Sequence, residues 1–187
     1  MGSVLKVKET PINGLTVVET KPHADERGTF SRFFCQHDLS PILGSRKIVQ
    51  INQSKTFKVG TVRGMHFQYP PNAEMKLVRC LKGQVWDVAV DLRPDSPTFL
   101  KWHSEVLSFE NARMMVIPEG FAHGFQVMEP ESELLYLHSA FYSLESEGGL
   151  RHDDPSLGIL WPITVTELSH RDSNHPFIKS DFRGLQI

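Results

Sequence analysis

The sequence contains only two cysteines, Cys35 and Cys80, among its 187 residues. A disulfide framework is therefore excluded, and a reducing compartment is expected. An excess of charge of one sign is also lacking, because 20 Lys and Arg stand against 22 Asp and Glu, for a net charge of −2. Nucleic-acid grooves and membrane-surface patches need clustered Lys and Arg, so neither kind of partner is expected.

Long hydrophobic runs are missing as well. No apolar run approaches the ~18 residues that a membrane helix needs, and the residues from Met1 to Thr10 contain no apolar core of a signal peptide. The hydrophobic fraction of 40% and the charged fraction of 22% are ordinary for a globular protein. The sequence thus predicts one soluble domain, residues 1–187, in the cytoplasm.

Helical periodicity is scarce, and the best helix candidate is short, near 36–43, where Pro41 acts as a breaker. Short strand patterns separated by Gly, Pro, Asn and Asp are much more frequent. They lie at 15–19, 30–34, 61–68, 76–81 and 113–117. Such spacing is typical of an all-β fold, an antiparallel jelly-roll sandwich or barrel with a few short helices. The polar residues 164–187 are expected to form a loop and a helical turn packed on this barrel.

Two longer segments, 84–92 and 134–142, alternate between the two faces of a strand. The second segment places Tyr136, His138 and Tyr142 on one face. Polar side chains on a strand that faces a barrel interior are informative, because burying them without partners is costly.

Histidine and tyrosine side chains on the expected strands are candidates for acid–base chemistry. His66 lies inside an apolar strand, and His123 follows a turn that leads into another strand. With Tyr136, they supply a base and an acid on rigid elements. Taken singly, each is more often a hydrogen-bonded core residue. Together with three basic residues, however, they favour a pocket that binds an anionic ligand. These residues are Arg63, Lys76 and Arg171.

The segments around His66 and His123 have the spacing of the two metal motifs of cupins. A cupin metal site requires His-x-His in the first motif, but Gln68 stands where the second imidazole would be. Two imidazoles are too few for a closed nitrogen and oxygen site. No metal is therefore expected, and a metal-dependent cupin oxygenase or isomerase is disfavoured. No other cofactor is expected.

Several dense motifs follow one another along nearly the whole chain. They are DERGTF at 25–30, NQSK at 52–55, RGMHFQ at 63–68, KLVRC at 76–80, IPEGFAHGF at 117–125, DDP at 153–155, LWP at 160–162 and LS-x-RD at 168–172. In this order they resemble the dTDP-4-dehydrorhamnose 3,5-epimerase family. The resemblance implies a metal-free cupin homodimer that acts on nucleotide-linked 4-keto-6-deoxyhexoses.

The resemblance also implies roles for individual residues. His66 would be the general base, Asp172 its orienting partner, and Tyr136 the acid that returns a proton on the opposite face of the sugar. Lys76 would stabilise the enolate. Tyr142, further along the same expected strand face as Tyr136, is expected to shape the pocket and not to transfer the proton. The remaining implied contacts are Arg63, His123 and Arg171 around the sugar and diphosphate, and Arg27, Gln50, Asn52 and Glu147 around the nucleotide, some of them from the second subunit.

Strict alternation would place Arg63 on the strand face opposite His66, unless Gly64 relaxes the pleat. A clear departure from the family pattern is Arg32, where a Glu is usual. A guanidinium only donates hydrogen bonds, and cytosine offers acceptors where thymine has its N3 donor. Arg32 then either binds the base or is a solvated surface charge.

Three readings of the function follow. The first is an epimerase that inverts C3, C5 or both in a dTDP-linked 4-keto-6-deoxyhexose. The second is a mono-epimerase of a CDP-linked sugar. The third, from a different class, is a non-catalytic cupin that binds sugar nucleotides, and the presence of both His66 and Tyr136 disfavours it.

Overall fold

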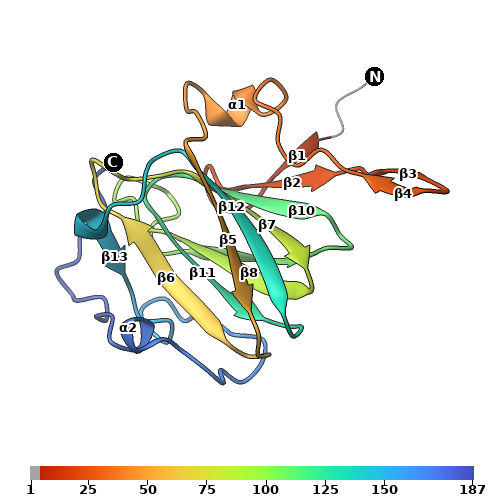
Figure 1. Cartoon of the computed structure of the whole chain (residues 1–187). Coiled ribbons are helices and arrows are strands. Elements are labelled where there is room, and N and C mark those ends of the chain that lie inside the picture. Colours follow the sequence, from red (N-terminus) through yellow and green to blue (C-terminus); the bar gives the residue numbers. More distant parts are fainter. Residues whose placement is uncertain (1–4) are drawn as a thin grey trace.

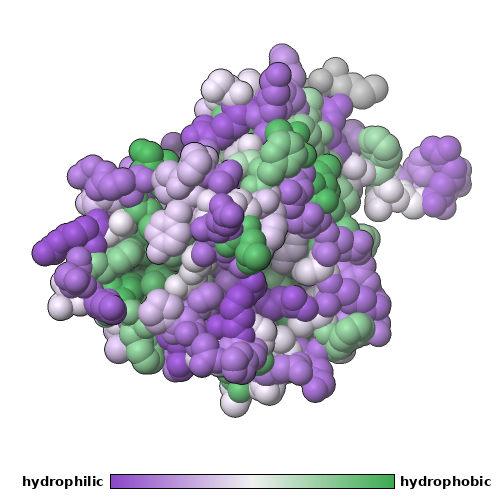
Figure 2. Space-filling view, turned by 60° about the vertical axis from the view of Figure 1, so that its left-hand side comes forward, coloured by the Kyte–Doolittle hydropathy of each residue, from purple (hydrophilic) through white to green (hydrophobic). Residues whose placement is uncertain are grey.

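The computed structural model describes residues 5–187. The first four residues of the segment from Met1 to Thr10, where no signal peptide is expected, lie outside the described residues. Two antiparallel sheets lie against each other, and a small two-stranded hairpin projects from one side (Figure 1). The expected all-β jelly roll is confirmed. In the face shown by Figure 2, hydrophilic side chains predominate and the hydrophobic ones form separate small groups.

The spatial order of the strands in each sheet differs from their order in the chain. From one edge to the other, the larger sheet consists of β1 (Leu5–Glu9), β2 (Thr16–Thr20), β10 (Arg113–Ile117), β7 (Lys76–Lys82), β12 (Ser132–His138) and β5 (Gln50–Thr56). The second sheet consists of β13 (Glu147–Gly149), β6 (Val62–Gln68), β11 (Phe121–Val127), β8 (Gln84–Asp91) and β9 (Trp102–Ser108). The hairpin consists of β3 (His23–Asp25) and β4 (Gly28–Phe30).

The helices are short. They are α1 (Ser40–Leu43), the 3-10 helix η1 (Leu144–Ser146) and α2 (His170–Ser173). Within residues 5–187, no helix has the length and apolar character needed to cross a membrane.

Apolar side chains form three layers. The interior between the two sheets is filled by buried side chains from both, among them Val78 of β7 and Phe125 of β11. On the outer face of the second sheet, Trp86 and Val88 pack against the segment that follows β13. On the outer face of the larger sheet, Leu43 of α1 contributes to a third cluster. Each such large side chain stabilises the fold by about 1.5–3 kcal/mol when fully buried.

The structure corrects two expected elements near the hairpin. Strand β4 ends at Phe30, so the strand expected at 30–34 is wrong beyond its first residue. Helix α1 begins at Ser40, and Pro41 lies in its first turn. Proline is tolerated there because the first N–H groups of a helix have no acceptor within the helix. Pro41 therefore lies in the first turn of this helix and does not break it.

Strand β12 ends at His138, so the strand expected to continue to Tyr142 is wrong at its end. In the register, His138 lies opposite Gln50 of β5 and Lys76 of β7, which are the last residues that those strands offer. One further backbone hydrogen bond, from the N–H of Ser139 to the carbonyl of Met75 at 3.0 Å, follows the paired strands, and the chain then leaves the sheet. Tyr142 consequently lies in a loop and is exposed.

Candidate active site

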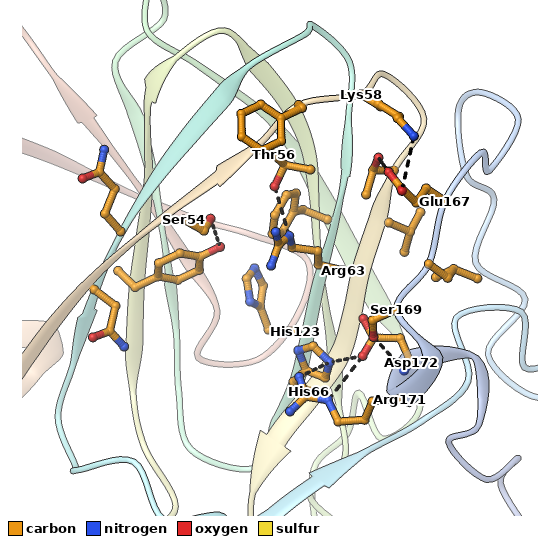
Figure 3. A pocket seen from close by; sticks show the side chains of 18 of the residues that line it. Ser54, Thr56, Lys58, Arg63, His66, His123, Glu167, Ser169, Arg171 and Asp172 are labelled. Carbon is orange, nitrogen blue, oxygen red and sulfur yellow. Dashed lines mark hydrogen bonds and ion pairs between the residues drawn. The ribbon is translucent and has the colours of Figure 1, made fainter.

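A pocket of about 620 Å³ opens at strands β5, β6, β7, β11 and β12 and at the segment that leads into α2. The sequence-predicted site residues that line it are Asn52, Arg63, His66, Lys76, His123, Tyr136, Arg171 and Asp172. The predicted residues outside its lining are Arg27, Arg32, Gln50, Tyr142 and Glu147. In the view of Figure 3, Ser54 lies on one side of the pocket and His66 with Asp172 on the other.

A bulge turns Arg63 and His66 toward the same side of β6. His66 is paired with His123 of β11, and Arg63 is paired with the residue two positions further along, so three steps on β6 match two on β11. The additional residue cancels the alternation that would have separated the two side chains. Gly64 lies at the bulge with a φ of +131°, and a Cβ there would be 2.6 Å from the Cα of Gly124. The expectation that Gly64 relaxes the pleat is therefore confirmed, and the placement of Arg63 on the strand face opposite His66 is wrong.

Asp172 holds the imidazole of His66. The distance from His66 Nε2 to Asp172 Oδ1 is 2.7 Å, and the other carboxylate oxygen accepts the N–H of Gly64 at 3.1 Å. Ser169 caps helix α2 by accepting the N–H of Asp172 at 3.0 Å, which fixes the start of that helix. When Nε2–H is donated to Asp172, Nδ1 of His66 keeps the lone pair that can take a proton.

The carboxyl group of Asp172 is buried, with only 2% of the side chain exposed. Burial opposes its ionisation, but the hydrogen bond and charge of His66 and the N–H of Gly64 outweigh burial and hold the pKa of Asp172 well below its usual range. Asp172 is therefore a carboxylate at neutral pH. It can stabilise the imidazolium that forms when His66 accepts a proton.

Tyr136 of β12 lies on the other side of the pocket. Its phenol shares a hydrogen bond of 3.0 Å with the hydroxyl of Ser54, and its ring lies edge-on to His123 with 6.3 Å between the centroids. Burial raises the pKa of Tyr136, while Ser54 and the charge of Arg63 lower it by less. The phenol is thus protonated at neutral pH and can serve as an acid.

His123 belongs to a second histidine–carboxylate pair. Its Nε2 lies 2.8 Å from Oδ2 of Asp87, and both side chains are buried. Burial raises the pKa of Asp87, and the charge of His123 and its hydrogen bond oppose that shift. The pair holds the imidazole of His123 in one orientation, beside the ring of Tyr136.

Lys76 also has a carboxylate partner, which sequence reasoning missed. Its Nζ lies 3.1 Å from Oε1 of Glu74, whose Oε2 accepts from Nδ1 of His138 at 2.8 Å. Glu74 lies in the loop before β7, where no periodicity marks a buried side chain. Ser54 was also missed, although it lies two residues after Asn52, and alternation along β5 could have placed both on one face.

Three predicted residues outside the pocket form a group at its rim. Gln50 Oε1 accepts the backbone N–H of Tyr142 at 3.1 Å, and the Tyr142 hydroxyl donates to Glu147 at 3.2 Å. Glu147 also accepts from Arg171 at 2.6 Å, which links the group to the pocket. The guanidinium of Arg171 in turn lies 3.4 Å from Nε2 of His66.

Two predicted arginines lie away from the pocket. Arg27 is in the turn of the projecting hairpin and pairs with Asp25 at 2.6 Å. Arg32 follows β4 and pairs with Asp38 at 2.9 Å. Within residues 5–187, the ion-pair partners of both guanidinium groups, Asp25 and Asp38, lie outside the lining of the pocket.

His66, Asp172 and His175 could offer three metal-ligand atoms within 4.8 Å of one another. The guanidinium of Arg171 occupies their neighbourhood, at 3.4 Å from His66 and 3.6 Å from Asp172. A metal cation placed there would be repelled by this charge. Gln68, at the second position of the cupin metal motif, uses its amide to bind backbone oxygens outside the pocket. The residues present therefore fit a metal site poorly.

Comparisons with known proteins agree with one another. The family model of dTDP-4-dehydrorhamnose 3,5-epimerase matches residues 9–180. A dTDP-4-dehydrorhamnose 3,5-epimerase of Shigella flexneri is 44% identical over 180 residues, which cover 95% of this chain and 99% of that protein.

Solved structures are similar over most of their length. The dTDP-6-deoxy-D-glucose-3,5-epimerase of Legionella pneumophila Philadelphia 1, in complex with dTDP-4-keto-L-rhamnose, has a TM-score of 0.90 and 36% identity, covering 98% of this chain and 99% of that one. The 3'-monoepimerase ChmJ of Streptomyces bikiniensis, in complex with dTDP-quinovose, has a TM-score of 0.83 and 30% identity, covering 90% and 85%.

Proposed function

The chain belongs to the dTDP-4-dehydrorhamnose 3,5-epimerase family and is an isomerase, and we propose that it inverts both C3 and C5 of a dTDP-linked 4-keto-6-deoxyhexose. The relatives named as 3,5-epimerases support the choice of both carbons, and one observation carries the inversion itself. The His66–Asp172 pair and the buried phenol of Tyr136 lie on different sides of the same pocket. Inversion of a carbon needs a base on one face of the sugar and an acid on the other.

His66 begins the reaction in this proposal. The carbons C3 and C5 both flank the ketone at C4, so their protons can be removed by a neutral imidazole if the resulting enolate is stabilised. Nδ1 of His66 takes the proton, and the electron pair of the C–H bond moves to the C4 oxygen. Asp172 stabilises the imidazolium, while the ammonium of Lys76 stabilises the enolate oxygen.

Tyr136 completes the inversion. Its phenol proton passes to the same carbon from the opposite face, while the electron pair returns from the oxygen to re-form the ketone. The high pKa that burial gives Tyr136 favours the protonated form between turnovers. Substrate and product have the same oxidation state, so the step as written needs no electron acceptor. Exchange of protons with water restores His66 and Tyr136.

The remaining substrate contacts are assigned by charge and position. Arg63 and Arg171 line the pocket and suit the diphosphate, with Asn52 toward the nucleotide. Arg27 lies on the projecting hairpin of β3 and β4 (Figure 1), and it does not line the pocket of its own chain. We propose that the protein is a homodimer in which this hairpin contributes to the pocket of the partner subunit. Sedimentation velocity measures whether the protein is a dimer in solution. The two free cysteines, Cys35 and Cys80, support a cytoplasmic location.

Proton NMR in D2O tests the function. The dTDP-linked 4-keto-6-deoxyglucose should exchange deuterium into both C3 and C5 and give the inverted product. Exchange at one carbon alone would identify a mono-epimerase, and faster exchange with the CDP-linked sugar would overturn the dTDP assignment. Absence of exchange with either sugar, together with tight binding, would support the non-catalytic alternative.

A further inference from the structure

A third histidine–carboxylate pair adjoins the pocket, on strand β12 beside Tyr136. Nδ1 of His138 lies 2.8 Å from Oε2 of Glu74, and both side chains are largely buried. The ring of His138 stacks on that of Tyr136, with 6.1 Å between the centroids and 19° between the planes. His138 also lines the pocket, in line with its place two residues after Tyr136 on the same strand face.

Glu74 serves two pocket residues at once. Its Oε2 accepts from His138, and its Oε1 lies 3.1 Å from Nζ of Lys76. Burial raises the pKa of Glu74, but the hydrogen bond from His138 and the charge of Lys76 prevail, so that the pKa lies below its usual value. Glu74 is therefore an anion at neutral pH that can accept from both neighbours.

The negative charge on Glu74 determines which atoms donate and which accept in the hydrogen bonds of His138. A carboxylate can only accept, so Nδ1 of His138 carries a proton, and Nε2 of the neutral ring becomes an acceptor. Nε2 lies 3.3 Å from Nδ2 of Asn52, the diagonal neighbour of His138 on β5. The Asn52 amide nitrogen therefore donates to His138, and its Oδ1 is left to accept a hydrogen bond from the substrate.

We propose that Glu74 and His138 are positioning residues of the site: Glu74 holds the ammonium of Lys76 and the Nδ1–H form of His138, and His138 holds the amide of Asn52. The proposal deepens, and rests on, the epimerase function proposed above. It assigns the donor and the acceptor of each hydrogen bond in the chain of contacts. His138 donates to the carboxylate of Glu74, Asn52 donates to His138, and the amide oxygen of Asn52 accepts from a hydroxyl or N–H of the substrate.

Two substitutions at His138 separate positioning from proton transfer. In His138→Gln, the amide N–H can still donate to Glu74 and the amide oxygen can still accept from Asn52, whereas His138→Leu can do neither. We expect His138→Leu and Glu74→Gln to lower kcat/KM for the dTDP-linked 4-keto-6-deoxyglucose about tenfold, as expected for the loss of one charged hydrogen bond. His138→Gln should stay within about threefold of the wild type.

Matched controls come from a similar group outside the pocket. Glu105 joins His103 at 3.1 Å and Arg113 at 3.0 Å, and none of the three lines the pocket. Glu105→Gln and His103→Leu should leave kcat and KM unchanged. In an Asn52→Ala background, His138→Leu should lose most of its effect, because the amide that it orients is gone.

The kinetics of the His138 and Glu74 variants decide the proposal. Wild-type kinetics in both His138→Leu and Glu74→Gln would overturn the proposal, and so would a His138→Gln variant as impaired as His138→Leu, since that would indicate proton transfer by the imidazole. If His138→Leu fails to fold, Glu74→Gln decides. If the wild type exchanges no deuterium, the proposed function fails, and the affinity for dTDP by calorimetry decides the positioning of Asn52 in the same variants.

Discussion

His66 and Asp172 are joined by a hydrogen bond of 2.7 Å, although they lie 106 positions apart in the chain. The second oxygen of Asp172 binds the backbone N–H of Gly64, which lies at the bulge of β6. The same bulge turns Arg63 toward the pocket. One local irregularity therefore positions the candidate base, its carboxylate partner and a cation for the diphosphate.

Replacing His66 should abolish proton abstraction. We expect His66→Asn to lower deuterium exchange at both C3 and C5 by at least about 10²-fold, because general base catalysis typically contributes 10²–10⁴-fold. Thermal unfolding should show that the fold is intact. NMR in D2O gives the exchange rates, and exchange at the wild-type rate at either carbon would place the base elsewhere, with His138 the next candidate.

Replacing Tyr136 should separate exchange from inversion. Tyr136→Phe removes the acid, so we expect net epimerisation to be lost while partial exchange persists, since His66 can return a proton to the face from which it came. Tyr142→Phe is the control, because Tyr142 is exposed in a loop outside the pocket, and it should keep both signals. Equal loss of exchange and inversion in Tyr136→Phe would assign Tyr136 to binding or to enolate formation.

The ionisation of Asp172 should make stability depend on pH. Its pKa in the folded protein lies below the ordinary value of 3.8, so its stabilising contribution is fully present above about pH 4 and is lost as the pH falls through the folded-state pKa. We expect Asp172→Asn to lower the free energy of unfolding at pH 7 by about 1–3 kcal/mol, because its buried hydrogen bonds to a charged group are weakened.

Urea unfolding at pH 7, 5, 4 and 3 measures this dependence. The difference in unfolding free energy between the wild type and Asp172→Asn should shrink as the pH falls below about 4. A difference that is constant over the series would mean that the charge of Asp172 does not stabilise the fold.

Arg32 tests the choice of nucleotide. Its guanidinium is engaged by Asp38, and the hydrogen bond from Arg32 is the main cause of the lowered pKa of that carboxyl group. We therefore expect Arg32→Glu to leave the ratio of dTDP to CDP affinity within about threefold of the wild type, and the wild type to prefer dTDP. Calorimetry with both nucleotides measures the ratio. A shift of tenfold or more would show that Arg32 contacts the base.

The inner strands and the chemistry-bearing residues could be predicted from the sequence. Strands β7, β8 and β10 are largely buried, so they read as continuous or alternating apolar runs. The strands that escaped prediction, β1, β3, β5, β9 and β13, lie at the edges of the sheets, where polar side chains interrupt the pattern. The alternation of β12 likewise predicted that Tyr136 and His138 share a face.

Only the tertiary structure decided how the site is completed. Pairing between β6 and β11 sets the bulge that brings Arg63 beside His66. The end of the neighbouring strands removes Tyr142 from β12. Glu74 lies in a loop without periodicity, yet the fold brings it to His138 and Lys76. A sequence pattern reports the faces of a single element, whereas register, strand ends and loop contacts depend on hydrogen bonds between residues that are distant in the chain.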